Sequence, residues 1–294
     1  MTALTISDVL DLDYPGPPVW SSDSDFLAAA VYEDDGQALQ FADREGHAGW
    51  HYRPTDAHVS EFAWRPGGHD CLVATDDGRT VLVDPATETV RPLAEVAETD
   101  HTWSNGGDLV ACYRDGGPGT LDVETGVART FDVPERGPYL AEDQMFAWSD
   151  DDSYLAYRFV DRDAKQVGVV DVETGELVYR TDTAASSRSP TWLSGDRLLL
   201  DRIVDHATRR ELVVVEPGRG TETVVVREED PDLGIVSRGA PEVSPSGERA
   251  AVPLPLDGWD HLYLVDEDGA EQVTEGAFED KGLADSTPRW LGDD

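Results

Sequence analysis

The chain has 294 residues, which is enough for one large all-β domain or two average domains. Its eight Trp and nine Tyr supply large apolar surfaces, which argues against an intrinsically disordered chain. The 61 acidic and 23 basic residues give a formal charge of −38, which argues against binding to nucleic acid or to an anionic membrane.

The acidic residues are spread over most of the predicted turns and do not form one tail. Lys165 and Lys281 are the two lysines, so nearly all of the positive charge is arginine. An even acidic coat is typical of proteins that work in a salt-rich cytoplasm, where self-repulsion is screened within roughly 3 Å at 1 M salt. A functional acidic surface for a basic partner is the alternative.

The start of the chain has neither the basic nor the apolar segment of a signal peptide, and no apolar run is long enough to span a membrane. We therefore expect a cytoplasmic protein. Cys71 and Cys112 are too few for a disulfide framework, and both lie in apolar strand-like segments. They are predicted to be buried free thiols.

The first predicted element is a short helix over residues 5–10, in which Thr5 and Asp8 have the spacing of a capping box. After it, a repeated phrase runs to the end of the chain: a large residue, a polar turn and an apolar strand. We call the position of the large residue the slot. The slot residues are Trp20, Trp64, Trp103, Trp148, Trp192, Val243 and Trp290.

Each repeat contains four short runs of strand-forming residues. In the fourth repeat they cover residues 146–148, 154–159, 168–172 and 177–179, and turns rich in Asp, Ser and Gly separate them. A single four-stranded antiparallel sheet cannot bury both faces, but similar sheets stacked around an axis can. The sequence therefore predicts an all-β fold, a β-propeller with four-stranded blades.

The predicted organisation is one propeller domain over residues 1–294, with six complete blades and the start of a seventh at residues 285–294. Whether six blades close the ring is left open. An open ring would expose sheet edges at which the chain self-associates or needs a partner. The blades are expected near residues 18–58, 59–98, 99–141, 142–185, 186–235 and 236–280.

The phrase Pro18-Val19-Trp20-Ser21, followed by an Asp turn and Leu27-Ala28, resembles the propeller repeats of the prolyl oligopeptidase family and of TolB-like proteins. Residues 4–12 resemble the entry segment of acylaminoacyl-peptidase-type members. The resemblance implies a propeller that caps an α/β-hydrolase domain and restricts access to short peptides. It also implies that the chain is the front portion of a longer ancestor.

The chemistry of that hydrolase domain needs a Gly-x-Ser-x-Gly nucleophile elbow, and no serine of this chain has glycine at both flanking positions. Ser237 has Gly239 after it but Ile235 before it. No catalytic, cofactor-binding or metal-binding residue is therefore assigned, no cofactor is expected, and whether the chain is an enzyme by itself stays open.

The sequence and the resemblance support two alternative functions. The first is the non-catalytic propeller of a serine peptidase whose α/β-hydrolase domain is separate or missing. The second is a stand-alone TolB-like scaffold that binds a peptide or protein. A propeller enzyme of another class is a third, weaker option, because the metal-dependent kind needs Asn ligands and Asn105 is the only Asn.

Other chemistry-bearing residues have plainer interpretations. His47 and His51 have metal-like spacing but lie at a turn that enters a strand, and the acidic runs at 33–35 and 150–152 lack the pattern of a calcium loop. Paired carboxylates could hydrolyse glycosides, but with so many acidic residues no pair is informative.

The aromatic and remaining histidine residues are interpreted by their place in the repeat. The slot tryptophans are predicted to pack between blades, whereas Trp50 and Trp259 are the candidates for exposed aromatic residues. Three histidines fall near the ends of repeats, where a cluster could form: His58, His69 and His101.

Overall fold

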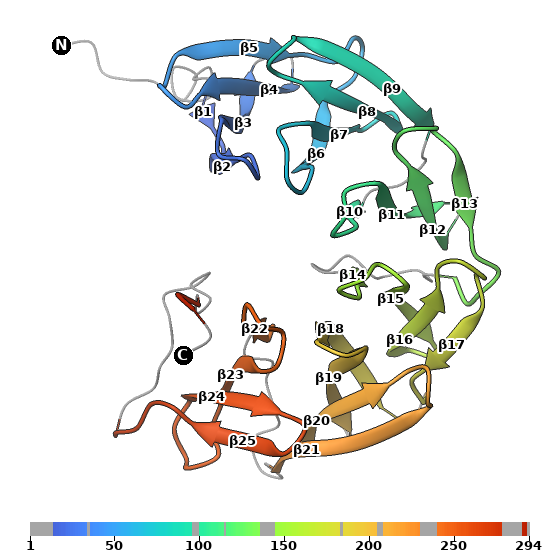
Figure 1. Ribbon diagram of the computed structural model, residues 1–294, viewed down its shortest axis with the longest axis vertical. Helices are drawn as coiled ribbons and strands as arrows, with labels where there is room; N and C mark the ends of the chain where they lie inside the picture. The colour runs from blue at the N-terminus through green and yellow to red at the C-terminus, as the bar shows by residue number, and fades with distance from the viewer. Residues whose placement is uncertain are drawn as a thin grey trace. The chain divides into compact units, whose positions relative to one another are not determined.

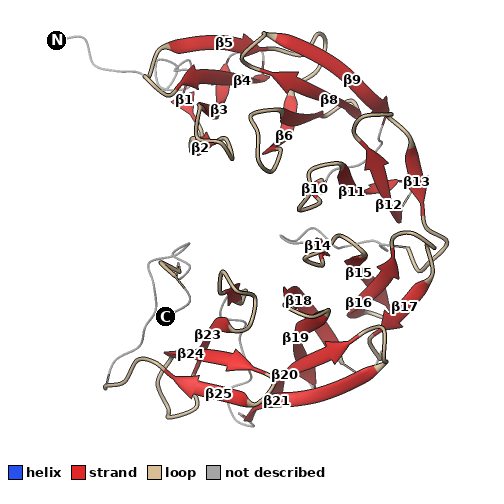
Figure 2. Cartoon of the chain, in the orientation of Figure 1, coloured by secondary structure: helices blue, strands red, loops and turns tan. Residues whose placement is uncertain are grey.

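The structure is a computed structural model that describes residues 14–33, 36–95, 100–114, 116–135, 145–182, 185–204, 208–229, 240–277 and 290–292. All regular structure within these ranges is β-strand (Figure 2). The helix predicted over residues 5–10 lies outside the described residues. The chain divides into two compact units, Met1–Thr130 and Phe131–Asp294, which we describe separately.

The first unit contains three antiparallel sheets, which we number in chain order (Figure 1). Sheet 1 consists of β1 (Tyr14–Pro15), β2 (Val19–Trp20), β3 (Phe26–Glu33), β4 (Gly36–Asp43) and β5 (Ala48–Tyr52). Sheet 2 consists of β6 (Val59–Trp64), β7 (Cys71–Thr75), β8 (Arg79–Asp84) and β9 (Thr89–Glu95). Sheet 3 consists of β10 (Thr102–Trp103), β11 (Leu109–Arg114), β12 (Gly117–Asp122) and β13 (Ala128–Thr130).

The second unit contains the other three sheets, which are also antiparallel meanders. Sheet 4 consists of β14 (Phe146–Trp148), β15 (Tyr154–Asp161), β16 (Ala164–Asp171) and β17 (Leu177–Arg180). Sheet 5 consists of β18 (Ser186–Leu193), β19 (Arg197–Val204), β20 (Arg209–Glu216) and β21 (Thr221–Glu229). Sheet 6 consists of β22 (Glu242–Val243), β23 (Ala250–Leu254), β24 (His261–Asp266) and β25 (Gly269–Gln272).

The all-β prediction and the six four-stranded modules are confirmed. Sheet 1 differs in one respect, because the short strand β1 pairs with β3 at Tyr14↔Tyr32 in addition to the pairing of β2 with β3. The assignment of residues 1–294 to a single domain stays a prediction. Of the predicted seventh start, the structure describes residues 290–292.

The turn after the slot explains why serine recurs there. In four modules the serine hydroxyl accepts a hydrogen bond from the backbone N–H five residues later, as in Phe26 to Ser21 at 3.0 Å and Tyr154 to Ser149 at 2.9 Å. Leu109 with Ser104 and Arg249 with Ser244 repeat this contact. The hydroxyl thereby satisfies a backbone donor at the tip of the hairpin, which fixes where the next strand starts.

The acidic turn between the third and fourth strands has its own mechanism. Asp122 accepts the backbone N–H of Thr125 at 2.8 Å, and Asp171 accepts that of Thr174 at the same distance. The glycines that follow, Gly126 and Gly175, have φ of 70° and 78°, a conformation that glycine adopts without steric cost. These carboxylates therefore shape hairpins, which is a sufficient reason for their recurrence.

Apolar side chains fill the space between consecutive sheets within each unit. Because side chains alternate along a strand, each sheet sends one set towards the preceding sheet and one towards the next. In the first unit Leu39 and Phe41 of sheet 1 pack with Cys71 and Val73 of sheet 2. In the second unit Leu212 of sheet 5 belongs to one cluster with strands β23 and β24 of sheet 6.

Candidate functional site

The slot tryptophans make one repeated contact between sheets. In four of them the indole Nε1–H donates to the backbone carbonyl of the residue that precedes the slot in the preceding module. Trp64 donates to Val19 at 2.9 Å and Trp103 to Ala63 at 3.1 Å. In the second unit Trp192 donates to Ala147 and Trp290 to Glu242, both at 2.9 Å. We call this contact the indole clasp.

The clasp satisfies the polar end of a side chain whose ring is buried between two sheets. The four slot tryptophans Trp64, Trp103, Trp148 and Trp192 are only 9%, 9%, 7% and 6% exposed. The predicted role in packing between modules is confirmed for Trp64, Trp103 and Trp192, which belong to the clusters between sheets 1 and 2, sheets 2 and 3, and sheets 4 and 5. Val243, which has no side-chain donor, packs against the cluster between sheets 5 and 6.

Trp20 is the exception. Its side chain is 51% exposed, and it makes no hydrogen bond within the described part of the chain. The predicted core role is therefore wrong for this slot, because within the first unit sheet 2 packs on the opposite face of sheet 1. Trp290 is half-buried and forms the clasp, so the seventh repeat phrase contacts sheet 6 as the earlier phrases contact their sheets.

The register of sheet 1 identifies the face to which Trp20 belongs. Trp20 lies opposite Leu27, Leu27 opposite Ala42, and Ala29 opposite Gln40. Leu27, Ala29, Gln40 and Ala42 are all half-buried. We call these four residues together with Trp20 the outer face of sheet 1.

The matching positions of sheet 2 are fully buried. Trp64 lies opposite Cys71, Cys71 opposite Val83, and Val73 opposite Val81. All five pack in the cluster between sheets 1 and 2. Within the first unit, the same five positions of the repeat are therefore an interface in sheet 2, and no sheet packs on them in sheet 1.

Ion pairs join neighbouring sheets at the slot turns. Arg65 follows the slot of sheet 2 and lies 3.3 Å from carboxylate oxygens of Asp70, Asp108 and Glu124, the last two on sheet 3. In the second unit Arg197 of sheet 5 lies 2.7 Å from Glu267, which follows β24 of sheet 6. These contacts fix the order of the sheets more than they stabilise them, because such exposed pairs contribute little.

A histidine makes the corresponding link between sheets 1 and 2. The Nδ1 atom of His69 lies 2.7 Å from Asp23, which also accepts the hydroxyl of Ser21. Burial raises the pKa of Asp23, but the hydrogen bonds from Ser21, His69 and the backbone of Asp25 outweigh it and lower this pKa to about 2. Asp23 is therefore ionised at neutral pH and pairs with the His69 ring of sheet 2.

Sheet 5 contains a buried ion pair that the sequence pattern did not reveal. Arg210 on β20 is 1% exposed, and its Nε donates to the fully buried carboxylate of Asp201 on β19 at 3.0 Å. Glu228 on β21 lies 3.7 Å from the same guanidinium group. The expectation that acidic residues coat the surface is wrong for Asp201, because its cross-strand neighbour supplies the compensating charge.

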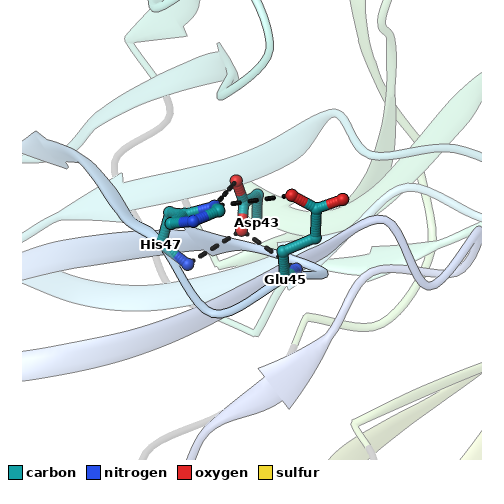
Figure 3. A group of neighbouring side chains, drawn as sticks. All are labelled: Asp43, Glu45 and His47. Carbon is teal, nitrogen blue, oxygen red and sulfur yellow. Dashed lines mark hydrogen bonds and ion pairs between the residues drawn. The ribbon is translucent and has the colours of Figure 1, made fainter.

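One group of side chains has the geometry of a metal site (Figure 3). Ligand atoms of Asp43, Glu45 and His47 lie within 4.8 Å of one another. The carboxylate of Asp43 is already used by the turn, since it accepts the backbone N–H groups of Glu45 and His47 and lies 3.0 Å from the His47 ring. The backbone bond from His47 is the largest cause that lowers the pKa of Asp43. The group is an exposed hairpin turn of the kind seen at Asp122.

The other histidines have separate environments. His51, which lies four residues after His47 in the sequence, is exposed on β5, whereas His47 belongs to the turn just described. His101 is buried and lies 3.2 Å from Glu61 of sheet 2. His58 borders an open hollow of about 460 Å³ that is also lined by Gly36, Gln37, Arg53, Pro54, Asp56 and Ala57.

Gly36 is required at this hollow. Its φ is +128°, and a Cβ there would lie 1.7 Å from the ring of His58. Two of the residues that line the hollow are charged, Arg53 and Asp56, and Arg53 already has an interaction partner.

The remaining sequence candidates are structural. Asp151 accepts hydrogen bonds from the Ser149 hydroxyl and the Ser153 backbone N–H, so the acidic run at 150–152 forms a turn. The other acidic run, Glu33-Asp34-Asp35, lies largely outside the described residues. Trp50 is half-buried and stacks on Phe41 with ring centroids 5.9 Å apart. Trp259 is 42% exposed, as predicted. Asn105 lies in the turn after β10.

The cysteines and the membrane prediction can also be compared with the structure. Cys71 and Cys112 are both free and buried, as predicted, and burial raises the pKa of the Cys71 thiol. Among the described residues there is no helix with the length and apolarity needed to cross a membrane.

Comparison with known proteins identifies the fold. No family model and no curated protein matches the sequence. Among solved structures, dipeptidyl peptidase 4 of Porphyromonas gingivalis matches with a TM-score of 0.68 and 14% identity, over 93% of this chain and 49% of that one. The dihydro-heme d1 dehydrogenase NirN, in complex with DHE, matches with a TM-score of 0.63 and 16% identity, over 88% and 56%.

A third structure is similar in length to this chain. The β-propeller domain of Cps50 (Swd1) from Myceliophteria thermophila matches with a TM-score of 0.51 and 16% identity, over 90% of this chain and 89% of that one. At these identities the likeness establishes the fold alone. The chain spans about half the length of the first two structures. The fold of this chain is therefore a β-propeller of the kind found in dipeptidyl peptidase 4 and NirN.

Proposed function

We propose that this chain is the non-catalytic β-propeller of a prolyl-oligopeptidase-like serine peptidase, which limits access to an α/β-hydrolase domain that these 294 residues do not contain. The observation that carries the proposal is the match to dipeptidyl peptidase 4, which takes in 93% of this chain but only 49% of the peptidase. The part of that structure which resembles this chain is thus one portion of a larger enzyme.

Two features of the chain support this proposal. The sequence has no Gly-x-Ser-x-Gly elbow, and the described residues contain strands only, whereas a hydrolase domain needs helices around a parallel sheet. The clasp between Trp290 and Glu242 supports a seventh module that begins at the slot of Trp290. The proposal therefore includes a propeller with more than six modules.

The proposal is tested on the purified chain and on its complex with an α/β-hydrolase domain, if one is encoded in the same coding region. The chain alone should not react with a fluorophosphonate probe and should not cleave a chromogenic dipeptide. In the complex, kcat/KM for a substrate of about thirty residues should fall at least tenfold relative to the hydrolase alone, while that for a tripeptide stays the same. Labelling of the chain by the probe, or equal cleavage of long and short substrates by a verified complex, would overturn the proposal.

A stand-alone interaction scaffold is the second candidate. The observation in its favour is the Cps50 (Swd1) match, which covers 90% of this chain and 89% of a structure that is a propeller domain by itself. The coding region next to this chain separates the two candidates. A hydrolase reading frame with a Gly-x-Ser-x-Gly elbow supports the peptidase, and a hydrolase-free neighbourhood together with a stable monomer supports the scaffold.

A further inference from the structure

The turn between β10 and β11 of sheet 3 contains a chemically labile pair of residues. Asn105, the only asparagine of the chain, is followed by Gly106, and both are exposed. Asparagine is heat-labile because the backbone nitrogen of the next residue can attack its side-chain amide. Glycine in that next position hinders the attack least, because it has no Cβ. The pair therefore meets the chemical requirement for loss of the amide group.

The backbone of this turn matches that of the turn between β14 and β15 of sheet 4. The N–H of Gly107 donates to the carbonyl of Ser104 at 3.0 Å, and the N–H of Asp152 donates to that of Ser149 at 2.9 Å. Gly107 and Asp152 both have positive φ, at 72° and 59°. The two turns can therefore be compared residue by residue.

The two turns differ in one side chain that fixes the backbone. Asn105 corresponds to Asp150, and Gly106 corresponds to Asp151. The carboxylate of Asp151 accepts a hydrogen bond from the Ser149 hydroxyl at 2.9 Å and so holds the turn of sheet 4. Gly106 has no side chain, so the turn around Asn105 lacks this carboxylate contact.

We propose that Asn105 is a site of spontaneous deamidation, and that its isoaspartyl product loosens the link between sheets 2 and 3. The backbone nitrogen of Gly106 attacks Cγ of Asn105 and closes a succinimide ring. The Cγ–Nδ2 bond breaks, and the amide leaves as ammonia with the proton of the attacking N–H. Water then opens the ring at Cγ, which gives aspartate, or at the main-chain carbonyl carbon, which gives isoaspartate with the chain continuing through Cγ. This chemistry does not depend on the proposed function.

The two products have different consequences for the turn. Aspartate fits, because Asp150 has the same place in sheet 4. Isoaspartate adds a methylene group to the main chain just before Gly107. A Cβ on Gly107 would lie 3.2 Å from Cγ of Arg65 and 3.3 Å from the carbonyl oxygen of Pro66, so the turn has no room to shift towards sheet 2. The lengthened chain must therefore move away from sheet 2, which separates Asp108 from Arg65, now 3.3 Å apart.

The indole of Trp103 reports on this link. It donates to the carbonyl of Ala63 in sheet 2 at 3.1 Å, and its ring centroid lies 6.0 Å from the guanidinium carbon of Arg65. Movement of the turn should therefore speed hydrogen exchange at Trp103. The clasp of Trp64 joins sheets 1 and 2 and should not change, so Trp64 is the internal reference.

The test ages the full chain at mildly alkaline pH, where the attacking nitrogen loses its proton more readily. Peptide mapping by mass spectrometry measures the gain of about 1 Da at Asn105. We expect the folded chain to react at no less than about one tenth of the rate of the chain unfolded in urea, because exposed turns are poorly protected. Gly106→Ala should slow the reaction by at least about tenfold, because the added Cβ hinders the attack.

The matched control for the change in charge is Asn105→Asp. Its Trp103 indole should exchange as slowly as in the original chain, whereas the aged chain should contain a fraction with exchange at least about threefold faster, measured by NMR. Treatment of the aged chain with a protein isoaspartyl methyltransferase, which converts isoaspartate to aspartate, should restore the slow exchange.

Three results would overturn the proposal. No mass gain in the folded chain, under conditions in which the unfolded chain deamidates, would mean that the turn protects Asn105. Equal rates in the original and Gly106→Ala chains would mean that this backbone nitrogen is not the attacking group. Unchanged exchange at Trp103 in a chain that contains isoaspartate would mean that the product does not loosen the link between sheets 2 and 3.

Discussion

The two faces of sheet 1 carry similar kinds of residues but have different surroundings. On the face towards sheet 2, Ala28, Leu39 and Phe41 are almost completely buried. On the outer face, Leu27 and Ala29 are half-buried and Trp20 is half exposed. Within the first unit, the repeat phrase thus produces a sheet with two apolar faces, and the face on which sheet 2 packs is the buried one.

The largest expected effect comes from removing the slot tryptophan of sheet 2, and the matched variant removes the slot tryptophan of sheet 1. Trp64→Ala should lower the free energy of unfolding by about 3–5 kcal/mol, because it leaves a cavity between sheets 1 and 2 and removes an indole clasp. Trp20→Ala should cost less than about 1 kcal/mol, because much of its ring is already in water. Urea denaturation of the full chain, followed by circular dichroism, measures both. Equal losses would mean that Trp20 is part of a packed interface.

A finer test keeps an aromatic ring at the slot and removes the indole hydrogen-bond donor. Trp192→Phe should cost about 1 kcal/mol or somewhat more, since the carbonyl of Ala147 loses its partner and the smaller ring leaves a gap. Trp20→Phe should leave the stability nearly unchanged. The same denaturation experiment checks the pair, and a neutral Trp192→Phe variant would contradict the structural role of the indole clasp.

A smaller effect is expected at the turns that link sheets. Arg65→Gln removes the pairing with Asp108 and Glu124 of sheet 3 and should cost about 0.5–1 kcal/mol at roughly 0.1 M salt. In about 1 M KCl, where the screening length is roughly 3 Å, the loss should shrink. A loss that does not depend on salt would indicate that the contact of the guanidinium group with the Trp103 ring, whose centroid lies 6.0 Å from the guanidinium carbon, is the main contribution.

The smallest expected effect depends on pH. The pKa of Asp23 is about 2, below its ordinary value of 3.8, so its stabilising contribution is complete above the ordinary value and disappears as the pH falls towards 2. Asp23→Asn should therefore be less stable than the original chain above about pH 4, and the difference should vanish near pH 2. Denaturation curves at successive pH values test this. A pH-independent difference would mean that the hydrogen bonds from Ser21 and His69 do not favour the ionised carboxylate.

Much of the fold could be predicted because its signals are local and repeated. The slot residue, the serine of the following turn and the Asp-x-x-Thr-Gly turn recur in sequence, and each has a local hydrogen bond that explains it, as at Ser149 and Asp171. The packing of Trp64 and Trp192 followed from the same repeat. These features depend on neighbours along the chain or on the next module.

The features that escaped prediction depend on long-range context. Trp20 has the same phrase as Trp64, so the sequence does not reveal that only Trp64 packs against a neighbouring sheet of the first unit. Asp201 and Arg210 pair across a hairpin, and in a chain with 61 acidic residues nothing in sequence separates a buried carboxylate from those on the surface. The hollow beside His58 likewise depends on Gly36 of one hairpin meeting the loop after another strand.

The most direct measurement is hydrogen exchange at the indole N–H of each tryptophan in the unmodified chain. We predict slow exchange at Trp64, Trp103 and Trp192, whose indoles are clasped to the preceding sheet. We predict fast exchange at Trp20, close to that of the exposed Trp259. Slow exchange at Trp20 in a monomeric sample would contradict the account in which Trp20 is the exposed slot of sheet 1.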